Sequence, residues 1–482
     1  MKNKKIVIHN EPDFNKARDR RKADTVFTDA TLKISSLLRD YAKGKRYFIR
    51  TYGCQANVRD SETMMGILEE IGFVHSDDYN EADVIIINTC AVRENAEDKV
   101  FGEVGSLKSL KAKRPGLIVA VGGCMVQQGV IVDTLKDKYA QVDLIFGTHN
   151  IEYLPDYLNE IITTRKRIID VISKPGEVIE NLPSVRIDRY KAFVNIIYGC
   201  DKFCTYCIVP YTRGRERSRK KEEVIKECQQ LVADGYQEIT LLGQNVNAYG
   251  KDLTDGTDFA ELLEAVAKLG IPRLRFTTSH PWDFSSKMIE VIGKYSNIMK
   301  AIHLPFQSGN ANILRRMGRR YTPDSYRALV DEMKAKIPGV SFTTDIIVGF
   351  PNETYEEFCD TKKMVEYVEF DNAFTFIYSP RPGTPASKLE DNVSEEEKHR
   401  RFDELVDTVE KCATLKAEQM VGKIYPILVD SVSKRNDEVM SGYTENNKLV
   451  NFPGTVDLIG KIVNVRILES KVYSLRGELV SE

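Results

Sequence analysis

No stretch of this 482-residue sequence approaches the roughly 18 consecutive apolar residues that a membrane span requires. The amino-terminal sequence lacks the apolar core of a secretion signal, and its acidic residues are atypical of a mitochondrial transit peptide. The net charge is only −2, so the total charge does not indicate a nucleic-acid-binding protein. We therefore expect a cytoplasmic protein without a membrane segment, in which any basic surface is local.

Two basic segments interrupt this balanced charge, YTRGRERSRKK at 211–221 and LRRMGRR at 314–320. Runs of like charge most often form solvated surface, but they can equally contact the phosphates of a nucleic acid. The charge pattern leaves both interpretations open.

Residues 45–162 alternate apolar runs with helical segments, which predicts a first domain. The runs YFIRT, DVIIINT and GLIVAVG predict strands, and the segments 60–72 and 95–113 predict the helices between them. Because the last two runs are apolar throughout, both faces of the sheet should be covered, as in parallel α/β sheets. Residues 1–44 are polar and aperiodic, and we expect them to form a poorly ordered or loosely docked extension.

A second alternating array follows at 186–418. Six apolar runs separated by helical segments predict an incomplete (β/α)6 relative of the (β/α)8 barrel, whose sites lie at the carboxyl ends of the strands. These runs are AFVNIIYG, QEITLLG, RLRFTTS, MKAIHLP, SFTTDIIVGF and NAFTFIY. A long charged helix, at about 394–422, leads out of the array.

Residues 421–482 form short β-branched segments separated by turn residues, which predicts a small antiparallel β-barrel. Barrels of this kind often bind oligonucleotides, and they can also serve as docking domains. The overall fold class is therefore α/β, with three domains in sequence.

We expect the nine cysteines to stay thiols and not to form a disulfide framework, because their number is odd and the sequence shows no secretion signal. Cys54, Cys90 and Cys124 each follow shortly after a predicted strand. The carboxyl ends of parallel strands meet at one edge of a sheet, where α/β proteins bind ligands, so three loops should bring three thiols together. The alternative is that each cysteine is a small buried apolar residue.

Cys200, Cys204 and Cys207 form a denser set at the end of the first strand of the predicted barrel. Zinc sites and ferredoxin clusters are normally closed by a fourth ligand. Here Cys228 stands alone in a predicted helix, and the six histidines are scattered. If the three cysteines bind a four-iron cluster, one iron stays open to another ligand, and that open position would be the active site.

The sequence CDKFCTYC, with C-x3-C-x2-C spacing, resembles the signature of the radical S-adenosylmethionine (SAM) enzymes. The resemblance implies that SAM chelates the open iron and that one electron cleaves its sulfonium to a 5′-deoxyadenosyl radical. Further motifs follow in the order expected for the methylthiotransferase branch of this family: TYGCQAN, INTCAVRENAEDKV, GGCMVQ, LLGQNVNAYG, TTSHPWDF, HLPFQSGN, TTDIIVGFPNET and FTFIYSPRPGTPA. The final segment resembles the TRAM domain of that branch. One departure is Asn352, where glycine is common in the family.

The resemblance implies a tRNA-modifying transferase that methylthiolates carbon 2 of N6-isopentenyladenosine at position 37, next to the anticodon, with two SAM per turnover. The hydrogen on this carbon is neither acidic nor readily displaced, so acid–base catalysis does not readily remove it, whereas a radical can react there. The implied partners are the anticodon stem-loop of tRNA and a reducing electron donor.

The resemblance also assigns six cysteines to two iron–sulfur clusters. The ligands of the catalytic [4Fe-4S] cluster are Cys200, Cys204 and Cys207. The ligands of an auxiliary cluster that supplies or carries the inserted sulfur are Cys54, Cys90 and Cys124. Cys228, Cys359 and Cys412 match no ligand position.

Loops at the carboxyl ends of the barrel strands carry candidate SAM-binding residues, which are Gln244, Asn245, His303, Gln307, Ile347 and Gly349. Each of these polar groups could instead satisfy loop backbone, and glycine 349 could be required by backbone geometry. Four alternating arginines just after the catalytic cysteines are candidate RNA contacts on an extended segment: Arg213, Arg215, Arg217 and Arg219.

Two other functions remain open at this point. A relative of the same branch could act on threonylcarbamoyladenosine in tRNA or on an aspartate of a ribosomal protein, although LLGQNVN and TSHP favour the isopentenyladenosine reading. A noncatalytic iron–sulfur protein that binds RNA or carries electrons would need a fourth cluster ligand, which the sequence does not offer.

Overall fold

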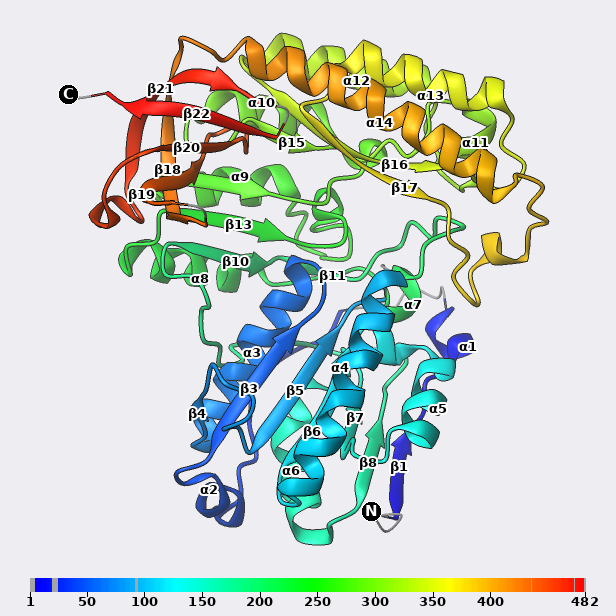
Figure 1. Ribbon diagram of the computed structural model, residues 1–482, viewed down its shortest axis with the longest axis vertical. Coiled ribbons are helices and arrows are strands. Elements are labelled where there is room, and N and C mark those ends of the chain that lie inside the picture. The colour runs from blue at the N-terminus through cyan, green and yellow to red at the C-terminus, as the bar shows by residue number, and fades with distance from the viewer. Residues whose placement is uncertain are drawn as a thin grey trace.

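The computed structural model describes residues 5–19, 25–91, 94–174, 176–434, 436–471 and 473–480 (Figure 1). In chain order they form a helix-flanked parallel sheet, a second helix-flanked array of parallel strands and a small closed barrel. In Figure 1 the blue-to-cyan sheet lies below the green-to-yellow array, and the orange-to-red barrel lies at one end of that array. Among the described residues, no helix is long and apolar enough to cross a membrane.

The N-terminal sheet has seven parallel strands in the order β1-β8-β7-β6-β5-β3-β4. The strands are β1 (Ile6–Asn10), β3 (Arg46–Thr51), β4 (Val74–His75), β5 (Val84–Thr89), β6 (Ile118–Gly123), β7 (Leu144–Phe146) and β8 (Arg167–Asp170). One face packs against α2 (Ser36–Ala42), α3 (Gln55–Ile71) and α6 (Leu154–Thr164). The other face packs against α4 (Glu94–Lys113) and α5 (Gly129–Lys138). The predicted covered parallel sheet is confirmed.

The prediction of a loosely docked extension over residues 1–44 is wrong for much of that segment. β1 is an edge strand beside β8, and α2 buries Leu38 and Ala42 in the core of the sheet. β2 (Phe27–Asp29) pairs with β9 (Val178–Glu180). These short elements are stabilised by partners far along the chain, so local sequence gave no periodic signal. Residues 1–4 and 20–24 lie outside the described part of the chain.

Helix α3 begins earlier than the predicted cap at Asp60 or Ser61. Its N-cap is Cys54, and the Asn57 side chain accepts a hydrogen bond from the Cys54 backbone N–H at 3.4 Å. Asp60 and Ser61 are buried inside the helix, where tertiary partners occupy them. The helix ends as predicted at Gly72, which adopts φ 116°.

The central array contains the six predicted parallel strands. They are β10 (Lys191–Asn195), β13 (Glu238–Leu242), β14 (Arg273–Phe276), β15 (Ala301–His303), β16 (Ser341–Val348) and β17 (Asn372–Ile377). β10, β13 and β14 form one sheet and β15, β16 and β17 another, and a parallel bridge between Leu274 and Ile298 joins them. The outer helices are α8 (Lys221–Ala233), α9 (Phe259–Ala267), α10 (Ser286–Lys294), α12 (Pro323–Lys336) and α13 (Tyr355–Val368). The partial barrel is confirmed.

The C-terminal barrel follows the long helix α14 (Glu395–Glu418) and closes in the order β18-β19-β20-β22-β21. Its strands are β18 (Ile424–Ser433), β19 (Asn436–Tyr443), β20 (Leu449–Pro453), β21 (Ile462–Ser470) and β22 (Ser474–Leu479). Four neighbouring pairs are antiparallel, as predicted, but β20 and β22 are parallel. An odd number of strands cannot alternate direction around a closed ring, so closure requires one parallel pair.

This barrel docks against the amino ends of the central strands. Arg273, the first residue of β14, donates hydrogen bonds to the carbonyls of Tyr443 and Pro426 at 2.8 and 2.7 Å. Lys448 donates to the carbonyl of Asp371, directly before β17, at 2.7 Å. The opposite end, where the carboxyl ends of the strands and their loops lie, is left for the site. The limits drawn for the domains stay predictions.

Candidate functional site

The structure brings Cys54, Cys90 and Cys124 to the same edge of the N-terminal sheet. They follow β3, β5 and β6, which are neighbours in the sheet. A hydrogen bond with Cys90 is the largest cause that lowers the pKa of the Cys54 thiol to about 5, and the charge of Arg213 acts in the same direction. This lowered pKa favours the thiolate, the form that binds metals.

Two buried asparagines, absent from the sequence prediction, hold the turns that carry these cysteines. Asn57 donates to the carbonyl of Thr89 at 3.0 Å, and Asn88 donates to the carbonyl of Asn57 at 2.8 Å. Gly123 adopts φ 98°, and a Cβ there would lie 2.4 Å from the Thr89 carbonyl oxygen, so only glycine fits. The sequence signal that could have identified them is the asparagine in each of the motifs QAN and INTC, close to a cysteine.

Arg213 connects this edge to the central array. Its Nε donates to the Cys124 sulfur at 3.0 Å, and its Nη2 forms an ion pair with Asp60 at 2.6 Å. Both charged side chains are buried. The prediction that Arg213 contacts RNA phosphate is therefore wrong, because its guanidinium is already used inside the protein.

The other three predicted RNA contacts divide in the same way. Arg219 is buried in ion pairs with Glu180 at 2.7 Å and Glu227 at 2.6 Å, so its predicted RNA contact is also wrong. Arg215 and Arg217 are half-buried, and their RNA contacts stay predictions. The sequence prediction treated residues 213–219 as one extended segment with its arginines on an exposed face. In the structure this segment runs from helix α7 (Val209–Thr212) into strand β12 (Arg217–Ser218).

The cysteine loop, residues 200–207, lies between β11 (Ile197–Tyr198) and α7 and is held on two sides. The backbone N–H of Cys200 donates to the carbonyl of Gly214 at 3.0 Å, and that of Thr205 donates to the carbonyl of Met317 at 2.9 Å. Gly199 enters the loop with φ 74°, and a Cβ there would lie 2.0 Å from the Arg215 carbonyl oxygen. These contacts hold the backbone of the loop and so constrain the orientation of the cysteine side chains.

The electrostatics of this loop differ from those of the sheet edge. Burial raises the pKa of Cys200 well above its ordinary value and that of Cys207 to about 12. The buried Arg319 lies 3.7 Å from the Cys204 sulfur and supplies a positive charge. In the described part of the chain, no three His, Cys, Asp or Glu side chains are arranged around a single metal ion. In an iron–sulfur cluster each cysteine binds a different iron, so three cysteine ligands do not have to surround one ion.

Three polar atoms on the loops after β13, β14 and β15 are buried and lack a hydrogen-bond partner among the described residues. They are Asn245 Oδ1, His280 Nε2 and Gln307 Oε1. The His280 Nδ1 accepts the Trp282 backbone N–H at 3.3 Å, and burial lowers the pKa of His280 well below its ordinary value, so the neutral ring carries its proton on Nε2. These loops therefore present one donor and two acceptors that a polar ligand could bind. The sequence prediction did not include His280 among the SAM-binding residues, although His280 lies in the motif TTSHPWDF.

The other predicted SAM-binding residues have protein partners. The Gln244 Oε1 accepts the N–H of Gly199 at 2.5 Å, so Gln244 positions the cysteine loop. His303 bonds Thr343 at 3.0 Å, and Ile347 packs against a small apolar cluster. Gly349 adopts φ 66° and donates to Glu353 at 2.8 Å. Direct contact of these residues with a ligand stays a prediction.

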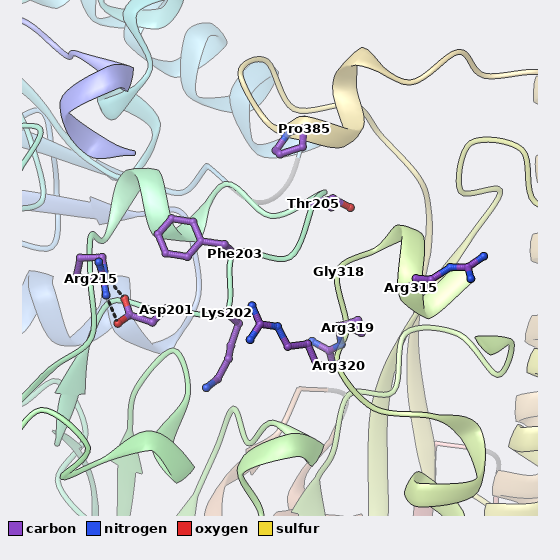
Figure 2. Close-up of a pocket in the computed structure, with 10 residues that line it drawn as sticks. All are labelled: Asp201, Lys202, Phe203, Thr205, Arg215, Arg315, Gly318, Arg319, Arg320 and Pro385. Atoms are coloured by element: carbon purple, nitrogen blue, oxygen red, sulfur yellow. Dashed lines mark hydrogen bonds and ion pairs between the residues drawn. The ribbon is translucent and has the colours of Figure 1, made fainter. Parts of the chain in front are cut away.

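An open cavity of about 680 Å³ lies against the cysteine loop (Figure 2). Five cationic side chains line it, and Asp201 is its one acidic residue. The cations are Lys202, Arg215, Arg315, Arg319 and Arg320. Figure 2 shows Arg215 paired with Asp201 on one side and Lys202 near Arg319 and Arg320 on the other. The cavity therefore suits an anionic ligand.

The remaining cysteines and one departure from the family pattern have structural explanations. Cys228 and Cys412 belong to the main apolar core, and Cys359 is half-buried on α13. Asn352 adopts φ 63°, a conformation that glycine favours and asparagine tolerates.

Three family descriptions match the chain. They are an uncharacterized protein family, UPF0004, over residues 46–147, the radical SAM superfamily over 194–365 and the TRAM domain over 418–480. Among solved structures, the radical S-adenosylmethionine methyltransferase TsrM from Kitasatospora setae is 13% identical with a TM-score of 0.52. The match covers 71% of this chain and 75% of that one, and it shows a shared fold.

The chain is similar to curated proteins that carry the name tRNA-2-methylthio-N(6)-dimethylallyladenosine synthase. The protein from Staphylococcus haemolyticus is 52% identical over 471 residues, which cover 98% of this chain and 91% of the relative. The protein from Geobacillus kaustophilus is 52% identical over 472 residues, covering 98% and 89%. With this identity along nearly its whole length, the chain belongs to the family of tRNA-2-methylthio-N(6)-dimethylallyladenosine synthases, within the radical SAM superfamily.

Proposed function

We propose that this protein is a cytoplasmic transferase that adds a methylthio group to carbon 2 of N6-isopentenyladenosine, also called N6-dimethylallyladenosine, at position 37 of tRNA. Each turnover would consume two SAM molecules. The observation that carries the proposal is the link between the two cysteine sets. Arg213 follows the catalytic cysteine loop closely in the chain, and its guanidinium contacts Cys124 of the other set.

The two cysteine sets would hold two iron–sulfur clusters. Cys200, Cys204 and Cys207 would hold a [4Fe-4S] cluster with one open iron, and Cys54, Cys90 and Cys124 would hold the auxiliary cluster. When bound, the first group supplies the electron that cleaves SAM, and the second supplies or carries the sulfur. The protein binds, orients and shields these groups.

A buried arginine lies beside each cysteine set. Arg319 beside Cys204 and Arg213 beside Cys124 place a positive charge near each set. The charge of Arg213 lowers the pKa of the Cys124 thiol and so opposes part of the burial that raises it. Each cysteine set therefore carries its own compensating charge.

Polar groups at the carboxyl end of the central strands would bind SAM. The unfilled atoms of Asn245, His280 and Gln307 match the amino acid, ribose and adenine groups of SAM, which offer both donors and acceptors. The remaining candidates contribute through loop geometry or apolar contact: Gln244, His303, Ile347 and Gly349. A site on these loops lies at the same end of the array as the cysteine loop.

The RNA partner would be the anticodon stem-loop, and a reductant would supply electrons. A base that must reach a buried centre has to leave its stack, which costs least in a single-stranded loop. The C-terminal barrel docks at the opposite end of the central strands, so it would bind RNA away from the reacting base.

A reconstitution experiment tests the proposed function. The purified chain, loaded with iron and sulfide, is incubated with SAM, a strong reductant and tRNA from a strain that lacks this activity, and the nucleosides are analysed by mass spectrometry. We expect 2-methylthio-N6-isopentenyladenosine. Product on threonylcarbamoyladenosine instead, or on a ribosomal-protein aspartate offered in parallel, would contradict the proposed substrate.

A further inference from the structure

Trp282, the single tryptophan of the chain, lies beside the cationic cavity. It belongs to a short 3-10 helix (Pro281–Asp283) after β14, and it is 37% exposed. The Lys202 Nζ lies 5.1 Å and the Arg320 guanidinium 4.9 Å from the centre of its ring system. Because Lys202 and Arg320 also line the cavity, an exposed aromatic ring stands at the cavity margin.

The cations of the cavity are not equally compensated. Lys202 pairs with Asp283 at 2.6 Å, and Arg215 pairs with Asp201. Arg315 and Arg320 are exposed, and neither forms an ion pair with any carboxylate in the described part of the chain. The guanidinium of Arg320, beside the aromatic ring, and that of Arg315, which lines the same cavity, are therefore available to a ligand.

We propose that Trp282, Arg315 and Arg320 form a binding site for unpaired RNA. One base stacks on the indole of Trp282, and the adjoining phosphates pair with Arg315 and Arg320. The inference rests on the proposed function and deepens it by naming the residues that hold the RNA loop. Stacking of bases on aromatic rings within a cationic groove is a general way to bind single strands.

The chemistry of the site favours RNA over other anions. SAM has only one carboxylate, and its sulfonium is positive. It could therefore not pair with the guanidiniums of both Arg315 and Arg320. An acidic peptide would satisfy the arginines but has no flat π-surface for the indole. A single-stranded nucleic acid offers both, because each of its nucleotides carries one phosphate and one base.

The position of the site connects it to the reaction centre. Lys202, which contacts the Trp282 ring, lies between Cys200 and Cys204 in the cysteine loop. A base stacked on Trp282 is thus held beside the loop that would carry the catalytic cluster. The site would position the RNA loop and would not take part in the chemical step.

The single tryptophan allows a direct measurement on the full-length chain. Indole fluorescence, excited where tyrosine absorbs little, is recorded during titration with an anticodon stem-loop RNA, a fully paired duplex of the same length, and polyglutamate. We expect strong quenching by the stem-loop and little by the duplex. Equal quenching by the duplex would overturn the inference, and quenching by polyglutamate alone would indicate an acidic protein partner instead.

Variants test the stacking step. Trp282→Ala should weaken stem-loop binding, measured by anisotropy of labelled RNA, by about tenfold, and Trp282→Phe should retain most of the affinity because it keeps a ring. Tyr367→Ala is the matched control. Tyr367 is 43% exposed on α13 and is likewise flanked by two cations, Arg327 at 5.5 Å and Lys334 at 6.0 Å. An unchanged affinity in Trp282→Ala would overturn the inference.

Salt dependence tests the phosphate contacts. Arg315→Gln and Arg320→Gln should each lower the slope of log affinity against log salt by about 0.7, the value for one phosphate of a single strand. Arg327→Gln, the control on α12, should leave the slope unchanged. Wild-type slopes in both cavity variants would contradict the site.

The outcomes separate this inference from the proposed function. If the wild-type enzyme methylthiolates tRNA and Trp282→Ala does so with an unchanged KM, the proposed function stands and the inference fails. If stem-loop RNA quenches Trp282 but no methylthiolated nucleoside forms, the RNA site stands and the proposed function fails.

Discussion

The two cysteine sets of this protein are built in opposite ways. Cys54, Cys90 and Cys124 come from three strand ends far apart in the sequence, whereas Cys200, Cys204 and Cys207 share one short loop. The first set includes an exposed thiol whose pKa falls to about 5. In the second set, burial raises the pKa of Cys200 and Cys207.

This difference shows two ways of fixing three ligands. At the sheet edge, the spacing of parallel strands and an asparagine network set the geometry, so the scaffold is the core of the domain. In the cysteine loop, backbone hydrogen bonds to Gly214 and Met317 set the geometry of the three ligands. The scaffold there consists of the two segments that contain these residues. Damage to one scaffold should therefore leave the other set largely intact.

The largest expected effect comes from removing each set separately. Changing Cys200, Cys204 and Cys207 together to alanine should abolish 5′-deoxyadenosine formation. Changing Cys54, Cys90 and Cys124 to alanine should leave that product detectable and eliminate the methylthiolated nucleoside. Iron should fall by about one cluster in each triple variant, because we propose that each set holds its own cluster. Repeated turnover to methylthiolated tRNA in the second variant would refute the division of roles.

Replacing the arginine that joins the two regions should have the next largest effect. Arg213→Gln leaves buried Asp60 without its cation, so urea unfolding should show a loss of about 3 kcal/mol. Arg114→Gln, which breaks a more exposed ion pair with Asp83 in the same sheet domain, should cost at most about 1 kcal/mol. Equal losses in the two variants would mean that Arg213 has no special structural role.

A glycine substitution tests the sheet-edge scaffold alone. Gly123→Ala combines a strained φ of 98° with a contact of 2.4 Å to the Thr89 carbonyl oxygen, and it should destabilise the protein by about 1–3 kcal/mol. It should also lower auxiliary iron while sparing cleavage of SAM. Gly116→Ala, where a Cβ meets nothing within 4 Å, is the control. Loss of 5′-deoxyadenosine in Gly123→Ala would show that the two scaffolds are not independent.

The smallest expected effect is a difference in alkylation rate in metal-free protein. Cys54 should react with iodoacetamide at pH 7 before Cys200 and Cys207, because its lowered pKa makes it a thiolate and their raised pKa keeps them protonated. Raising the pH should narrow the difference as the other thiols ionise. Peptide mass spectrometry gives the order of modification, and simultaneous reaction would contradict the assigned electrostatics.

Periodic patterns predicted the elements that carry the cysteines correctly. The apolar runs that become β5 and β6 could be recognised without information from distant segments, because burial on both faces leaves a local signal. The six strands of the central array were also predicted from their apolar runs. The start of α3 was misplaced, because Asp60 and Ser61 resemble caps but have tertiary partners. The edge strand β1 was missed because its partner, β8, lies about 160 residues further along the chain.

The order of the amino acids was enough to place three thiols at one sheet edge and three in one loop, since both follow from local spacing and strand direction. It was not enough to tell which arginines reach solvent. Arg213 contacts a cysteine 89 residues earlier in the chain, and Arg219 is buried between Glu180 and Glu227. Whether a charge is solvated or buried depends on the groups that folding packs around it, and those groups come from distant parts of the sequence.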